Sequence, residues 1–145
     1  MANGLYDDYV ESCMGAGAHS HSDLDTDTIK CGIASGSDYT ENLTTDQDWA
    51  DTTYAANVCY NSEATQTMTI TVGSPAARTC DSTDDTFTAV SQDAAKIVDA
   101  VVMYKDNAAT AATSPLIAFW DNGISVTPNG GDINITWNAS GLFTW

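Results

Sequence analysis

Positively charged residues are scarce in this sequence. Lysine and arginine together number 4 among 145 residues, against 20 aspartates and glutamates, which leaves a formal net charge of −16 at pH 7. A field of this sign repels the phosphates of nucleic acids and the surfaces of anionic membranes. We therefore expect no direct binding to nucleic acid or to a membrane, whereas a basic partner surface or high-salt surroundings would suit this charge.

Long apolar runs are also missing. The longest mostly apolar stretch, residues 94–104, contains Lys96 and Asp99 and is too short to cross a bilayer. The opening residues have neither the basic start nor the apolar centre of a secretory signal. We expect a protein that is made and kept in a cytoplasm, where N-x-S/T sequons carry no glycans. Such sequons begin at Asn42, Asn134 and Asn138.

The cysteines lack the C-x-x-C spacing that is typical of zinc sites and redox pairs. In a cytoplasmic product we expect them to be free thiols, used as small buried apolar side chains. Their even number leaves later oxidation open, and spacing alone does not say which pairs would meet. The cysteines are Cys13, Cys31, Cys59 and Cys80.

Motifs for catalysis and phosphate binding are missing as well. Both histidines lie in one loop, and no G-x-S-x-G sequence follows a predicted strand. Gly130 and Gly131 open no helix, which excludes the usual nucleotide-binding loops. Asp84 and Asp85 are neighbours, so on a strand they would point to opposite faces and would not share a site. We expect no enzyme, no catalytic residue and no cofactor.

Residues 19–27, H-S-H-S-D-L-D-T-D, are the most tempting collection of metal ligands. Carboxylates at alternate positions also open a calcium-binding EF-hand loop. That loop, however, needs a glycine where Thr28 stands and a bidentate glutamate where Ala34 stands. We interpret the stretch as a solvated acidic loop and predict no metal site.

Alternating polar and apolar residues, which are typical of half-buried strands, are what the sequence does contain. In residues 28–34 the alternation puts Ile29, Cys31 and Ile33 on one face. Residues 97–104 are almost continuously apolar, which predicts a strand that is buried on both faces. The other predicted strands are residues 58–60, 67–72, 86–90 (with Phe87 and Ala89 on one face), 116–120 and 142–145.

A hairpin is predicted near the end of the chain. Asn129 and Gly130 tolerate the positive φ of a tight turn. Ile124 and Val126 would pair with the strand that follows the turn, residues 131–137. Together with the strands above, this hairpin predicts a core formed by Ile97, Val98, Val101, Val102, Ile117, Phe119, Ile133 and Ile135.

One short helix is predicted within residues 4–14, with Leu5, Tyr9, Val10 and Cys13 on one side. We divide the chain into an N-terminal helix or arm (1–16), a loop (17–27) and a β domain (28–145). The predicted class is mainly β, an antiparallel β-sandwich-like single domain with one short N-terminal helix.

Several segments carry a resemblance to a known family. They are N-G-L-Y-D (3–7), D-T-D-T-I-K (25–30), D-D-T-F-T-A-V-S-Q-D (84–93), V-V-M-Y-K-D (101–106), A-T-A-A-T-S-P-L-I-A-F (109–119) and V-T-P-N-G-G-D-I-N-I-T-W (126–137). In this order they resemble small structural proteins that tailed bacteriophages encode. The chain departs from that pattern in residues 41–82 and in the H-S-H-S loop.

The resemblance implies a virion component that is assembled in the host cytoplasm. The preferred expectation is a capsid decoration (cement) protein on the outer capsid surface, bound to the major capsid protein as a homo-oligomer, with a trimer favoured. A tail or head–tail connecting component is the alternative in the same class. Trp120, Trp137 and Trp145 end strand-like segments, so a virion-displayed carbohydrate-binding module is a third reading, ahead of an enzyme that attacks the host envelope.

The ends of the chain are the expected contact regions, because aromatic anchors are common in interface cores and large apolar groups at a terminus would otherwise fray. The suspected subunit or capsid contacts are Leu5, Tyr6, Tyr9, Trp137, Leu142, Phe143 and Trp145.

Overall fold

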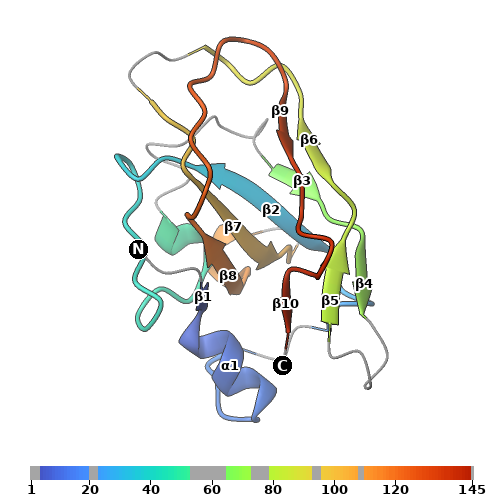
Figure 1. Cartoon of the computed structure of the whole chain (residues 1–145). Helices are drawn as coiled ribbons and strands as arrows, with labels where there is room; N and C mark the ends of the chain where they lie inside the picture. The colour runs from blue at the N-terminus through green and yellow to red at the C-terminus, as the bar shows by residue number, and fades with distance from the viewer. Residues whose placement is uncertain are drawn as a thin grey trace.

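The computed structural model describes residues 4–19, 23–52, 65–72, 79–92, 96–107 and 110–144. These residues form ten strands and a single α-helix, α1 (Asp7–Cys13), and every pairing between the strands is antiparallel (Figure 1). The predicted class, mainly β with one short helix near the N-terminus, is confirmed, and the arrangement of the sheets is compatible with a sandwich. Two short 3-10 helices, η1 (Trp49–Thr52) and η3 (Ala111–Thr113), complete the elements.

The largest sheet has five strands in the order β1-β8-β7-β2-β3. Its strands are β1 (Gly4–Leu5), β8 (Leu116–Trp120), β7 (Ala100–Lys105), β2 (Ile29–Ala34) and β3 (Thr65–Thr67). β7 lies at the centre and is buried along almost its whole length, as its continuous apolar sequence predicts. The two most apolar strands therefore have neighbours on both sides, whereas the shortest strands lie at the edges.

Two smaller sheets lie beside the large one. One has the order β10-β5-β4, formed by β10 (Phe143–Thr144), β5 (Thr79–Ser82) and β4 (Ile70–Val72). The other pairs β6 (Asp85–Phe87) with β9 (Ile133–Ile135). Figure 1 shows both running along one side of the molecule, at an angle to β2 and β7.

A single hydrophobic cluster joins the large sheet to the β6–β9 pair. Phe87, Ile133 and Ile135 contribute from β6 and β9, and they pack in the same cluster as Cys31 and Ile33 of β2. Phe87, Cys31 and Ile33 have no exposed surface. Burial of this shared apolar surface is the main stabilising contact between the two sheets.

Seven of the eight predicted core residues are buried, and the prediction for Ile97 is wrong. The buried ones are Val98, Val101, Val102, Ile117, Phe119, Ile133 and Ile135. Ile97 is 46% exposed because β7 begins only at Ala100. Before that point the chain is held by the bridge between Val98 and Val126 and by the hydrogen bond from Asp99 N–H to Ala34 O, which leave the side chain of Ile97 in solvent.

The predicted hairpin has the right turn residue and the wrong partner. Gly130 has a φ of +87°, as predicted. β9, however, pairs with β6, with Asp85 opposite Ile135, and Val126 instead bridges Val98. The residue types of a turn determine its local backbone conformation. They do not determine which distant strand pairs with the strand after the turn when several strands have similarly apolar faces.

Two other predicted strands are shorter than expected. Residues 67–72 divide between β3 and β4, which belong to different sheets, and Met68 between them is buried. β6 ends at Phe87, and Ala89 turns outward with a φ of 50°. The strand predicted at residues 58–60 lies outside the described residues.

The helix presents a different face from the predicted one. Asp8, Tyr9 and Ser12 are its buried residues, whereas Val10 is 37% exposed and Cys13 is exposed. Asp8 is polar but buried, because its carboxylate binds the loop that follows the helix instead of water. Leu5 precedes the helix and belongs to β1.

Candidate functional site

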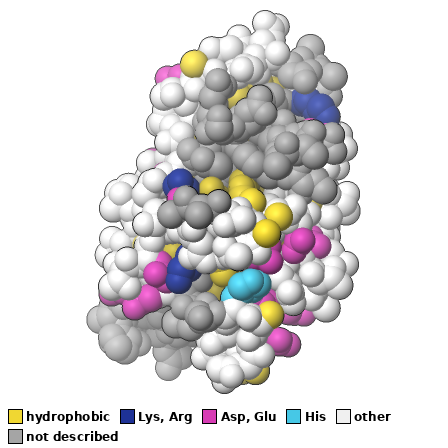
Figure 2. All heavy atoms as spheres, turned by 180° about the vertical axis from the view of Figure 1, so that it is seen from behind, with side chains coloured by type: hydrophobic (Ala, Val, Ile, Leu, Met, Phe, Trp, Pro, Cys, Tyr) yellow, Lys and Arg dark blue, Asp and Glu magenta, His cyan; other side chains and the backbone are white. Residues whose placement is uncertain are grey.

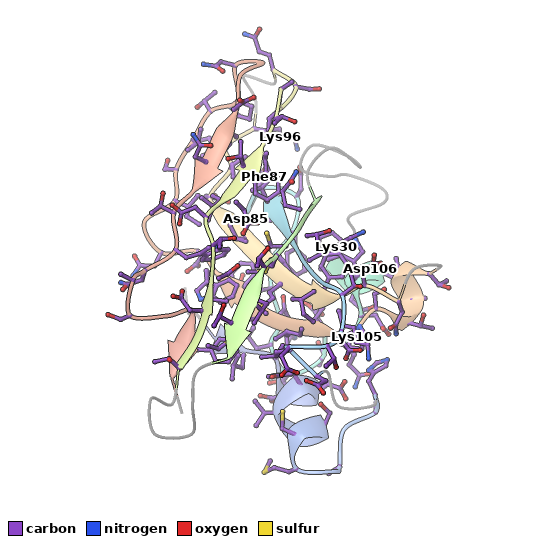
Figure 3. The ribbon with its side chains drawn as sticks, turned by 90° about the vertical axis from the view of Figure 1, so that its right-hand side faces the viewer. Lys30, Asp85, Phe87, Lys96, Lys105 and Asp106 are labelled. Atoms are coloured by element: carbon purple, nitrogen blue, oxygen red, sulfur yellow. The ribbon has the colours of Figure 1, made fainter. Side chains whose placement is uncertain are left out.

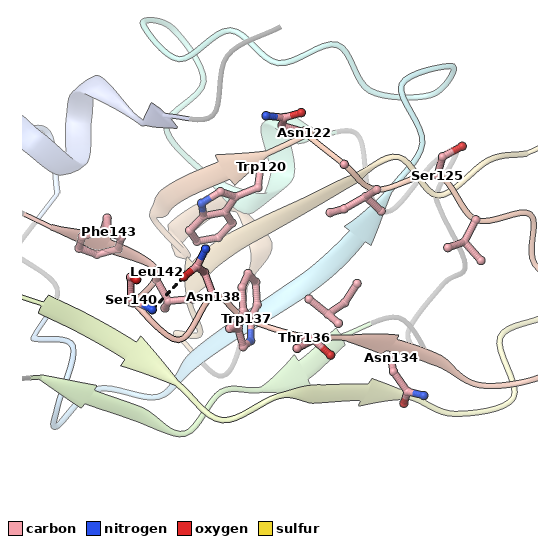
Figure 4. Close-up of a pocket in the computed structure, with 15 residues that line it drawn as sticks. Trp120, Asn122, Ser125, Asn134, Thr136, Trp137, Asn138, Ser140, Leu142 and Phe143 are labelled. Carbon is pink, nitrogen blue, oxygen red and sulfur yellow. Dashed lines mark hydrogen bonds between the residues drawn. The ribbon is translucent and has the colours of Figure 1, made fainter.

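A groove of about 720 Å³ lies between the segment that follows β8 and the segment that follows β9 (Figure 4). Its apolar lining consists of Trp120, Ile124, Val126, Ile135, Trp137, Leu142 and Phe143. Its polar lining consists of Asn122, Ser125, Asn134, Thr136, Asn138 and Ser140, together with Gly123 and Gly141. Clefts of this size and mixed chemistry are the usual places for small-molecule binding.

Two tryptophans face each other at the middle of the groove. Trp120 ends β8 and Trp137 follows β9, and their ring centroids are 5.2 Å apart at an interplanar angle of 60°. Both side chains are half-buried, so part of each indole remains open to the groove. The two positions are far apart in sequence, and only the packing of β9 beside the large sheet brings them together.

The orientation of Trp137 is set by two neighbouring carboxylates. Its indole Nε1–H donates to Oδ2 of Asp85 at 2.7 Å, and its backbone N–H donates to Oδ1 of Asp84 at 3.0 Å. Asp84 is exposed and Asp85 is buried, in agreement with the prediction that these neighbours point to opposite sides. They contact different groups of Trp137, its backbone N–H and its indole.

Asp85 is a buried carboxylate beneath the groove. It is 6% exposed, and burial raises the pKa of its carboxyl group. Hydrogen bonds from Trp137 and from the thiol of Cys31 act in the opposite direction, because they stabilise the charged form. Asp85 thus connects the aromatic pair to β2, on which Cys31 lies.

The polar side chains of the groove lie at its rim. Asn122, Ser125 and Asn138 are exposed, and Asn138 Oδ1 accepts a hydrogen bond from the backbone of Ser140 at 2.8 Å (Figure 4). Asn134 accepts a hydrogen bond from the hydroxyl of Thr86. The rim therefore combines amide and hydroxyl groups, which both donate and accept hydrogen bonds.

The described lining of the groove is uncharged. No described residue that lines the groove is Asp, Glu, Lys, Arg or His, although the whole chain has a net charge of −16. Neutral polar groups around an aromatic floor suit an uncharged ligand that has both apolar and hydroxyl-rich surfaces.

Two of the suspected intermolecular contacts are inside the protein, which corrects that prediction. Tyr6 has no exposed surface and Tyr9 is 7% exposed, so neither offers a surface to a partner. The hydroxyl of Tyr6 bonds to that of Tyr39 at 2.8 Å, and Tyr39 donates to Asp46 at 2.7 Å. Burial raises the pKa of both tyrosines, which keeps them protonated as donors. These side chains close the domain's own core.

The other suspected contacts remain partly exposed. Leu5, Trp137, Leu142 and Phe143 are half-buried and pack against the edge of the core cluster. Phe143 lies opposite Cys80 in the β10–β5 pair. Trp145 lies outside the described residues.

The histidine loop is anchored at its first residue, because His19 lies between two carboxylates, whereas Asp23 and Asp25 are exposed, as predicted for a solvated acidic loop. Its Nδ1 lies 2.7 Å from Oδ2 of Asp8, and its Nε2 lies 3.2 Å from Oδ1 of Asp48. The backbone N–H of Ala18 donates to the other oxygen of Asp8 at 2.6 Å. Burial raises the pKa of Asp48. These contacts clamp the loop to α1 and to the residue before η1. His21 lies outside the described residues.

The part of the chain that the structure describes has no cluster of metal ligands, and its lysines all have an aspartate partner. No group of three or more His, Cys, Asp or Glu residues there could hold a metal ion. The described lysines pair with aspartates: Lys30 with Asp106 at 2.6 Å, Lys105 with Asp27 at 2.8 Å, and Lys96 with Asp38 (Figure 3 labels the lysines). Figure 2 shows acidic side chains scattered over this face, with few basic ones among them.

The described cysteines are free thiols. They are Cys13, Cys31 and Cys80, and Cys59 lies outside the described residues. Burial is the main cause that raises the pKa of Cys31 and that of Cys80, the latter to about 11. Both thiols therefore stay protonated near neutral pH and behave as apolar core groups.

Comparison with known proteins assigns no family to the chain. No protein-family model matches it, and no curated protein matches it. Within the described ranges, no helix is long and apolar enough to span a membrane.

Proposed function

We propose that this chain is a structural component of a tailed-bacteriophage particle, most specifically a decoration protein on the outer capsid surface. The resemblance of its segments to small phage structural proteins supports this proposal, and the β-rich fold is in keeping with it. The observation that carries it is the charge balance. A net charge of −16, with the described lysines already paired to aspartates, suits the outside of a capsid better than its DNA-filled interior.

Two edge strands are the proposed attachment regions. β1 ends the five-stranded sheet and carries Leu5, while β10 ends the β10-β5-β4 sheet and carries Phe143 beside Leu142. Edge strands offer unpaired backbone groups to a further strand, and the half-buried apolar side chains on them would gain burial in the same contact. The major capsid protein is the proposed partner.

Oligomerisation belongs to the same proposal, with a trimer at a capsid symmetry axis favoured. Several weak contacts acting together would give a decoration protein its affinity for the lattice. The contacts must include apolar or basic surface, because copies that each carry −16 repel one another. The proposed role is structural, without catalysis.

Binding to undecorated capsids tests this proposal. We expect the full chain to bind capsids and to saturate at a copy number that scales with the number of capsid subunits. Replacing Leu5 and Phe143 by serine should weaken capsid binding, while the exposed change Val10→Ser should not. A protein found only in tails, in a few copies per particle, would contradict the decoration role and favour the tail alternative.

A further inference from the structure

We infer that the groove between β8 and β9 is a binding site for a neutral oligosaccharide, which would stack on Trp120 and Trp137. This inference does not rest on a capsid location, because the site is complete within one chain. It concerns the aromatic pair and the amide-lined part of the groove. Figure 4 places Phe143 at the opposite end of the groove from Ser125 and Asn134.

The aromatic pair supplies the apolar half of the recognition. The faces of a pyranose ring carry C–H groups. The hydrogens of these groups have a small positive charge, which is attracted to the negative face of an indole ring. Trp120 and Trp137 lie 5.2 Å apart at 60°, so their open surfaces form an angled platform rather than a closed stack. Such a platform offers two differently inclined surfaces to successive sugar rings.

The platform is fixed before any ligand arrives. Two carboxylates hold Trp137 through its indole and backbone N–H groups, and one of them, Asp85, is itself buried. Trp120 is the last residue of β8, which pairs with central strand β7. A site that is already ordered loses less side-chain entropy on binding.

The rim supplies the polar half of the recognition. Asn122, Asn138 and Ser125 are exposed at the groove and carry both donors and acceptors. Sugar hydroxyls need both kinds of partner, and they bind at low cost where the polar groups remain partly hydrated. The apolar floor and this rim thus match the two kinds of surface on a sugar.

The electrostatics of the groove select a neutral sugar. The described lining has no ionisable side chain, and the chain around it carries a net charge of −16. An anionic sugar would meet repulsion without any compensating cation in the described lining. The volume of about 720 Å³ falls within the range of ligand clefts and leaves room for more than one sugar ring.

Binding of defined trisaccharides by the full chain tests the inference. The probes are maltotriose, cellotriose, mannotriose and triacetylchitotriose, with sialyllactose and a galacturonate trimer as anionic counterparts. Saturation-transfer NMR and tryptophan fluorescence report binding. We expect at least one neutral probe to bind, little change in affinity between low and high salt, and no binding of the anionic probes at low salt.

Matched variants locate the site. Trp120→Ala should weaken binding about tenfold, which corresponds to about 1.4 kcal/mol, because it removes one of the two aromatic surfaces of the platform. Ser125→Trp changes an exposed residue of the lining and should block the groove without removing any core contact. Trp49→Phe is the aromatic control, because Trp49 stacks on Tyr104 at 4.1 Å outside the groove.

Each outcome decides the inference. Binding that both groove variants lose and that Trp49→Phe retains supports it, with circular dichroism showing that the variants are folded. The inference is overturned if no neutral probe binds at millimolar concentration. It is also overturned if only anionic probes bind, or if a peptide or a second copy of the chain occupies the groove. Leu142 and Phe143 belong both to the proposed capsid contacts and to one end of the groove, so Trp120→Ala, which changes neither, separates the two: it should lose sugar binding and retain capsid binding.

Discussion

At the scale of single residues, Asp85 combines burial with a hydrogen bond to a residue of the groove. It is 6% exposed, and of the other described carboxylates only Asp8 is buried as deeply. Asp85 orients Trp137 through a 2.7 Å hydrogen bond. A buried carboxylate with a raised pKa weakens the fold at neutral pH, because the folded state disfavours the charged form. We infer that the ordered indole offsets this cost.

The pH dependence of unfolding should reveal that cost. Because the pKa of Asp85 is raised in the folded state, folded protein binds the proton more tightly than unfolded protein does. The contribution of Asp85 to the free energy of unfolding should therefore grow as the pH falls from neutral through the folded pKa. It should level off below the unfolded value of about 3.9.

The variant Asp85→Asn isolates this contribution. Asparagine keeps an oxygen that accepts the indole N–H of Trp137, but it does not titrate. Urea unfolding at pH 7 and at pH 4, close to the unfolded value, should show a smaller gain on acidification in the variant than in the parent protein. The exposed change Asp7→Asn removes the same charge and controls for the general relief of repulsion. Equal pH dependence in Asp85→Asn and the parent would contradict the raised pKa.

Burial also separates two isoleucines that look equivalent in the sequence. Ile133 is 5% exposed in the shared core, whereas Ile97 is 46% exposed. Ile133→Ala should lower the free energy of unfolding by about 2–5 kcal/mol, because it removes buried methylene groups and leaves a cavity. Ile97→Ala should stay within about 0.5 kcal/mol. Chemical denaturation of both variants measures the difference, and similar losses would mean that the inward face of β9 is wrongly assigned.

At the scale of elements, the pairing of β6 with β9 is the decisive contact. It holds Phe87 against Ile133 and brings Trp137 beside Asp85. The chain turns at Gly130 before it enters β9. Two backbone hydrogen bonds hold this turn, because Gly130 N–H donates to Val90 O and Val90 N–H donates to Gly131 O.

Gly130 is therefore a sensitive position for backbone reasons alone. Its φ is +87°, and an added Cβ would meet nothing within 4 Å, so sterics with other residues do not enter. Gly130→Val should cost about 1–2 kcal/mol or more, since a β-branched residue is disfavoured in the left-handed region. Asn134→Ala, which loses one exposed hydrogen bond to Thr86, should cost less. Thermal unfolding that ranks the two variants equally would argue against the turn.

At the scale of the whole molecule, the excess of negative charge opposes both folding and association. The chain carries −16, and the described lysines already pair with aspartates. The repulsion among the remaining carboxylates is spread over the surface and is screened by salt. The hydrophobic core shared by the sheets must exceed this repulsion for the fold to persist.

Salt should therefore stabilise the protein. Raising the ionic strength from roughly 0.01 M to roughly 1 M shortens the Debye length from about 30 Å to about 3 Å. We expect the melting temperature to rise across that range, and oligomers to become more populated, in sodium chloride as well as in potassium chloride. A melting temperature that falls with salt would indicate that the paired lysines outweigh the general repulsion.

The local sequence determined much of this protein's secondary structure. The alternation in residues 29–34, the apolar run at Leu116–Trp120 and the turn residue Gly130 predicted β2, β8 and a positive φ correctly. These features depend on a residue and its near neighbours. Strand periodicity follows from the pleat of the backbone, and a positive φ follows from the lack of a Cβ.

Only the tertiary structure decided which strands pair and which side chains meet. β9 pairs with β6 rather than with residues 124–126, and Trp137 thereby meets Trp120 and Asp85. His19 likewise finds Asp48 only after the loop folds back. Several strands have similar apolar faces, so the local sequence pattern is compatible with more than one strand pairing. The packing of the whole core resolves this ambiguity, because the pairing of β6 with β9 buries Phe87, Ile133 and Ile135 together.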